Sequence, residues 1–89
     1  MEEVLFKTEE PKHRGEVAQF LRQLADKVEA GEVTLRQGDQ EQQVRIPRDL
    51  VLETKLEREI KHDVEKLSLE VELEWRPDGG SAKSGVELA

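Results

Sequence analysis

Nine residues near the C-terminal end of the chain, LSLEVELEW from Leu67 to Trp75, decide the fold. Apolar side chains occupy the odd-numbered positions, and serine or glutamate occupies the even-numbered ones. Because successive side chains of a strand point to opposite faces of a sheet, this alternation predicts a β-strand with one apolar face and one anionic face. A sheet that is packed on one face and wet on the other is typical of antiparallel pairing. We therefore expect the apolar face to be buried and the carboxylates to lie in water.

Two further strands are predicted, one over residues 50–60 and one near the N-terminus. Residues 50–60 repeat the alternation, with Arg58 interrupting the apolar positions, and we expect its long stem to lie over the apolar face with its charged end in water. A first, shorter strand is expected from Glu3 to Thr8, with Val4 and Phe6 on one face.

A hairpin is predicted between these two strands. Its strands are residues 32–37 and 42–47, and pairing Val33 with Ile46 leaves a four-residue loop over residues 38–41. Proline at the end of the second strand cannot donate to a ladder, so that strand should end there.

Charge selects the register of the last hairpin, which turns at His62 and Asp63. One register opposes Glu57 to Glu70, and like charges directly across a ladder are destabilising. We therefore expect the register shifted by two residues. Its pairs are Glu59 with Lys66, Lys55 with Glu70, Glu53 with Glu72 and Leu50 with Trp75.

Helical spacing is found in one segment, Arg14 to Ala30. Its apolar residues recur at intervals of three and four and form one stripe, namely Val17, Phe20, Leu21, Leu24 and Val28. This pattern predicts an amphipathic helix with one buried face. Gly31 is expected to end it in the left-handed conformation. No Ser, Thr, Asp or Asn stands at the start, so the first residue is predicted only to within a few positions.

The predicted fold class is α+β: an antiparallel sheet of about five strands in the order β-α-β-β-β-β, with the helix on its apolar face. One domain should cover residues 1–76. Residues 77–89 lose all periodicity and predict a flexible tail. One helix is a narrow cover for five strands, so we also expect a homodimer.

Composition excludes several classes of protein. The chain has 89 residues, with 21 acidic and 14 basic side chains for a net charge of −7, and no cysteine or tyrosine. Disulfides and sulfur-ligated zinc are therefore excluded. No apolar run approaches the ~18 residues of a membrane span, and the first residues do not read as a signal peptide. We expect a cytoplasmic protein that does not enter a membrane.

No constellation of reactive side chains is evident. His13 lies near the start of the helix, and His62 with Asp63 lies in a predicted turn, without a hydroxyl nucleophile at a recognisable spacing. The glutamates of the last two strands are assigned to water, where nothing should raise their pKa. We expect no catalytic residue, no metal site and no cofactor, and hence a protein that is not an enzyme.

Two surfaces could bind a partner. Trp75, with Arg76 beside it, lies at the end of the last strand, where an indole could close the core or anchor a protein or a second subunit. The alternative is a nucleic-acid or anionic-ligand surface on Arg36, Arg45 and Arg48, which the net negative charge disfavours.

The chain resembles the amphi-Trp domain family, small domains named for an amphipathic terminal strand that ends in tryptophan. The residues that carry the resemblance are Glu2 to Lys7, Glu16 to Lys27, Gly31 to Leu35 and the strand that ends in Glu74-Trp75. The resemblance covers about residues 2 to 76 and implies this architecture, but no particular activity or ligand. From the residues and the resemblance together, we expect a non-enzymatic module that binds another protein or itself.

Overall fold

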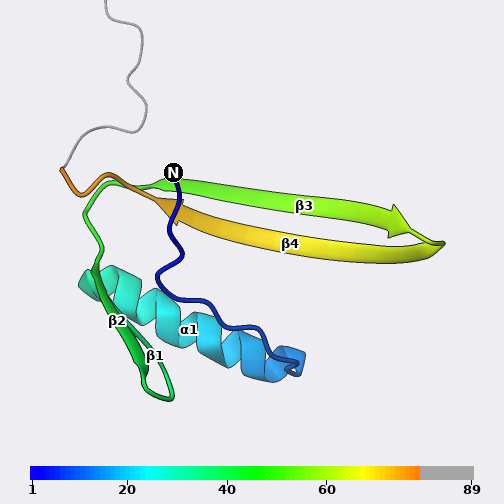
Figure 1. Ribbon diagram of the computed structural model, residues 1–89. Coiled ribbons are helices and arrows are strands. Elements are labelled where there is room, and N and C mark those ends of the chain that lie inside the picture. The colour runs from blue at the N-terminus through cyan, green and yellow to red at the C-terminus, as the bar shows by residue number, and fades with distance from the viewer. Residues whose placement is uncertain (79–89) are drawn as a thin grey trace, which may run out of the picture. The chain divides into compact units, whose positions relative to one another are not determined.

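The computed structural model describes residues 1–78 and divides the chain into two compact units, Met1–Ile46 and Pro47–Ala89. Residues 1–78 contain one helix and four strands, which form two antiparallel sheets of two strands each (Figure 1). The predicted α+β class is confirmed. The single sheet of five strands and the order β-α-β-β-β-β are wrong. Within the described residues, no helix is both long and apolar enough to cross a bilayer.

The helix α1, Arg14–Ala30, has the bounds that the spacing predicts. Gly31 ends it with φ at 88°, in the left-handed region, and its N–H reaches the carbonyls of Lys27 and Val28, each at 3.0 Å. These bonds satisfy acceptors that the end of a helix otherwise leaves open. The predicted role of Gly31 is confirmed.

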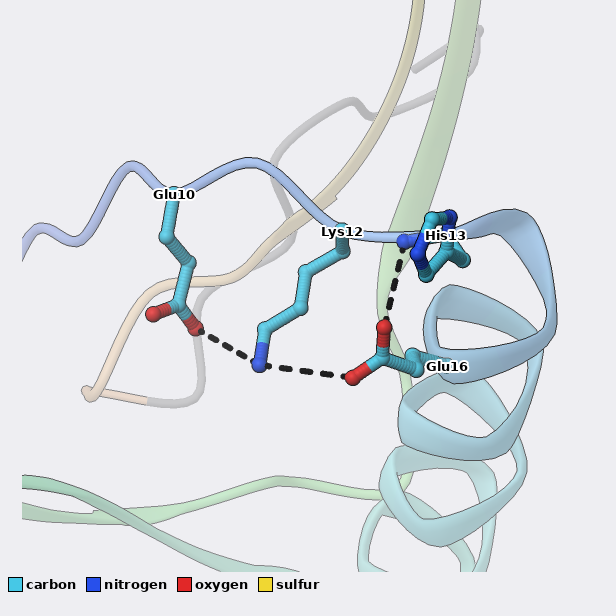
Figure 2. A network of polar contacts seen from close by, with 4 residues as sticks. All are labelled: Glu10, Lys12, His13 and Glu16. Atoms are coloured by element: carbon cyan, nitrogen blue, oxygen red, sulfur yellow. Dashed lines mark hydrogen bonds and ion pairs between the residues drawn. The ribbon is translucent and has the colours of Figure 1, made fainter.

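The start of α1 is held by Glu16 rather than by a hydroxyl or amide side chain. The backbone N–H of His13, the N-cap residue, donates to Oε1 of Glu16 at 3.3 Å (Figure 2). Lys12 Nζ lies between the carboxylates of Glu10, at 3.7 Å, and Glu16, at 3.8 Å. A glutamate at this position accepts a hydrogen bond from the N-cap amide, and its negative charge interacts favourably with the positive end of the helix dipole.

The first hairpin joins β1, Glu32–Gln37, to β2, Gln40–Arg45. Val33 lies across from Val44, so the predicted pairing of Val33 with Ile46 is wrong by two residues. The loop has two residues, not four. Gly38 takes the first loop position with φ at 58°, which matches the twist of the flanking strands.

Ile46 extends the pairing one step beyond β2, where it lies across from Gly31, the residue that ends the helix. Its N–H donates to the carbonyl of Gly31 at 2.8 Å. Ile46 and Val33 are the two buried apolar residues within residues 1–78, at 9% and 7% exposure. They form the centre of the first unit, in which α1 contacts β1.

The predicted strand over Glu3 to Thr8 is absent from the structure, where this segment has no regular secondary structure. Val4 is exposed, while Phe6 is half-buried and lines a hollow with Phe20 and Leu35. Two apolar residues supply little energy to hold a strand in a ladder. The contacts of Phe6 therefore position this segment, and no strand pairing does.

The second hairpin joins β3, Val51–Lys61, to β4, Val64–Glu74. Its register is the predicted one, with Lys55 across from Glu70, Glu59 across from Lys66 and Glu53 across from Glu72. The turn consists of His62 and Asp63, with φ at 51° and 63°. Residues 79–89, most of the predicted flexible tail, lie outside the described residues.

Candidate interaction surface

The side of the β3–β4 hairpin that carries its leucines is the candidate site, and we name it the apolar face. Its members are Leu52, Thr54, Leu56, Arg58 and Ile60 of β3 with Glu65, Leu67, Leu69, Val71 and Leu73 of β4. Leucines lie directly across from one another in two of its pairs, Leu56 with Leu69 and Leu52 with Leu73. The pairing thus gathers apolar side chains from both strands into one continuous stripe.

Within the described part of the second unit, no residue covers this stripe. Six of its large apolar side chains are between 60% and 74% exposed, namely Leu52, Leu56, Ile60, Leu67, Leu69 and Val71. The prediction that they are buried is wrong. A two-stranded hairpin has no second layer of its own, so alternation decides which side chains share a face but not what covers them.

An ion pair lies on the apolar face near the turn, beside Ile60. Arg58 Nε lies 3.1 Å from Oε2 of Glu65, and both side chains are exposed. The expectation that the charged end of Arg58 reaches water is confirmed. The pair neutralises two charges that would otherwise lie singly among apolar neighbours.

The opposite end of the face is less exposed. Leu73 and Trp75 are half-buried, and Trp75 directly follows β4. Arg76, its neighbour in the chain, places Nη2 2.7 Å from Oδ2 of Asp78. The structure thus puts both residues that the sequence singles out at the end of the apolar stripe, with the guanidinium already paired.

The other face of the hairpin is charged, and Lys55 lies at its centre. Its Nζ is 3.3 Å from the carboxylate of Glu57 and 3.6 Å from that of Glu70. The hydrogen bond to Glu57, with the attraction of both carboxylates, raises the pKa of Lys55 above its ordinary value. Lys55 is therefore the counter-charge of the two carboxylates beside it, Glu57 and Glu70.

Three carboxylates meet near the end of this face. Oxygen atoms of Glu53, Glu72 and Glu74 lie within 4.8 Å of one another, and all three side chains are exposed. A hydrogen bond with Glu74, and its negative charge, raise the pKa of Glu72. The expectation that no pKa on this face is raised is therefore wrong. The sequence predicts Glu53 across from Glu72 and Glu74 on the same face, but it does not predict that the three carboxylates approach one another.

The remaining candidate residues do not assemble into an enclosed site. His13 is the exposed N-cap of α1, and His62 is exposed in the turn of the second hairpin. Arg36 Nε lies 3.4 Å from Glu41 and Arg48 Nη2 lies 3.5 Å from Asp49. Arg45, in the ladder, lies across from Glu32. Each of the three arginines thus has an acidic neighbour.

Comparison with known proteins identifies a family but no characterised relative. A search of curated proteins and a search of solved structures each found no match. The family model described as the Amphi-Trp domain matches residues 1–89. An alternating terminal strand that ends in Trp75 is the feature on which the resemblance rested. The chain belongs to the Amphi-Trp domain family.

Proposed function

We propose that this chain is a non-enzymatic interaction module, and that a protein surface, either a second copy or another protein, covers its apolar face. The observation that carries the proposal is the exposure of six large apolar side chains on one face of one hairpin. Contiguous exposed apolar surface of this kind marks interaction sites in soluble proteins.

The arrangement of charge around the stripe supports the same function. The Arg58–Glu65 ion pair lies at one end, and the charged face carrying Lys55 lies on the opposite side of the ribbon. An apolar centre with charged surroundings is the usual anatomy of an interface between proteins. Trp75, half-buried at the other end, is of a residue type enriched among interface anchors.

A charged substitution at the centre of the stripe tests the proposal. Leu56 is 74% exposed, so Leu56→Lys should fold normally but should prevent the face from being covered. Val51→Lys is the matched control, because it makes a similar change on the opposite face of the same strand.

Sedimentation velocity and affinity capture should be compared for the wild type and the two variants. We expect the wild type and Val51→Lys to associate with themselves or retain a protein, and Leu56→Lys to lose this association. A Leu56→Lys variant that associates as the wild type does would refute the proposal. Trp75→Ala, checked for retained folding by circular dichroism, separates an anchor from a core residue.

A further inference from the structure

The second hairpin has a long unpaired edge on β4. Within residues 1–78 this strand hydrogen-bonds with β3 alone, so its other side exposes backbone donors and acceptors along 11 residues. No proline or glycine interrupts β4. An edge of this length pairs readily with another strand unless charge or shape prevents it.

We propose that β4 pairs antiparallel with β4 of a second copy, centred on Leu69, so that two hairpins form one four-stranded sheet. This inference rests on the proposed function and narrows it to one partner and one edge. Antiparallel pairing keeps apolar residues on one side, because residues directly across a ladder share a face.

The sequence of β4 is complementary to itself in this register. From one copy to the other, the pairs are Leu69 with Leu69, Ser68 with Glu70, Leu67 with Val71, Lys66 with Glu72, Glu65 with Leu73 and Val64 with Glu74. Each unlike pair occurs twice because the dimer is symmetric. No like charges oppose one another, and two attractive pairs join Lys66 to Glu72.

Other registers are less favourable. Centring the pair on Glu70 opposes that carboxylate to its own copy, and centring it on Ser68 leaves fewer residues paired. The β3 edge is also less suitable. Full overlap of two β3 strands, centred on Leu56, opposes Glu53 to Glu59 twice, which offsets its two attractive pairs of Lys55 with Glu57. Charge therefore selects β4 over β3 and the Leu69 centre over its neighbours.

The surroundings of Glu72 favour the same pairing. Glu72 lies across from Glu53, and Glu74 is close enough to raise its pKa. A lysine from a second copy would bring a further positive charge to this group of carboxylates, beside that of Lys55. The four-stranded sheet would also widen the apolar face, because its outermost strands would lie about 14 Å apart, at three spacings of about 4.8 Å.

Charge reversal at the paired positions tests the proposal. Lys66→Glu should oppose Glu72 in its own dimer, and Glu72→Lys should oppose Lys66 in its own dimer, so each variant alone should self-associate about tenfold more weakly than the wild type. Mixing the two variants should restore association, because both cross-copy pairs are then of opposite charge. Sedimentation equilibrium measures the first effect, and native mass spectrometry of an isotope-labelled mixture measures the second.

Two controls make the test specific. Lys61→Glu changes the same charge on the same face of the hairpin but on β3, across from Val64, and should leave the dimer unchanged. Circular dichroism of each variant checks folding, and rescue on mixing would itself exclude misfolding.

The outcomes separate this inference from the proposed function. In one outcome, the wild type dimerises, Lys66→Glu and Glu72→Lys leave the dimer intact, and the two variants do not pair preferentially when mixed. This result would overturn pairing through the β4 edge but not self-association. A wild type that is monomeric at all concentrations would overturn the edge dimer. The proposed function would then be decided by whether Leu56→Lys abolishes capture of another protein.

Discussion

Lys55 lies directly across from Glu70 in the β3–β4 ladder, with its ammonium 3.6 Å from that carboxylate and 3.3 Å from Glu57. One cation therefore offsets two anions at the centre of the charged face. In its absence, Glu57 and Glu70 would have no counter-charge between them. Cross-strand pairs of opposite charge are the unit by which such a sheet is stabilised.

The substitution Lys55→Gln is expected to lower the melting temperature by a few degrees at most, since exposed ion pairs contribute little. Thermal denaturation at low and high salt checks this, and the difference from the wild type should shrink at high salt. Lys61→Gln, across from Val64, is the control and should change the melting temperature less. An equal loss in both variants would contradict the role given to Lys55.

Glu72 predicts a pH dependence of stability with a definite sign. Its pKa in the folded chain is raised, chiefly by Glu74, so folding favours the protonated form. The stabilisation is fully present below the pKa of the unfolded chain and is lost as pH rises through the folded-state pKa. We therefore expect Glu72→Gln to raise the melting temperature slightly at neutral pH and to have little effect in acid.

The measurement is thermal denaturation across the carboxyl titration range, at dilutions where the chain is monomeric. Glu59→Gln serves as the comparison. Glu59 lies across from Lys66, so its substitution should lower the melting temperature at neutral pH. A stabilising effect of Glu72→Gln that persists unchanged in acid would show that the carboxylate charge is not the cause.

The alternating strand shows which features of the fold can be predicted from the sequence alone. Leucine and glutamate alternation over residues 67–75, with the charges of Lys55 and Lys66, sufficed for the strand, its faces and its register. It could not show that Leu56 and Leu69 would be exposed. Burial depends on a second layer, which a two-stranded hairpin does not itself contain.

The first hairpin fails for a different reason. Val33 and Ile46 are both apolar, which favours pairing them, but the N–H of Ile46 donates to the carbonyl of Gly31, two residues before Val33. Glycine followed by aspartate, at positions 38 and 39, is itself a signal for a two-residue loop. A two-residue loop at these positions places Val33 across from Val44, as observed.

Nucleic acid is not expected to bind to the arginine surface. Arg36 and Arg48 each lie within 3.5 Å of a carboxylate, and the whole chain carries a charge of −7. Phosphate binding needs an excess of unneutralised cations. Fluorescence anisotropy of a short labelled oligonucleotide at low ionic strength should therefore show no change. A salt-dependent rise that Arg36→Gln removes would instead support the alternative function.

Substitutions in the turn of the second hairpin should stabilise the folded chain. His62 and Asp63 both have positive φ, at 51° and 63°, where side chains with a Cβ are strained. Asparagine followed by glycine suits this turn best, so His62→Asn with Asp63→Gly should stabilise the hairpin by about 1 kcal/mol. Urea denaturation measures this change. Gly38→Ala, at φ 58° in the first hairpin, should have the opposite effect. A destabilised double variant would mean that the two native side chains make contacts that outweigh the strain of their backbone.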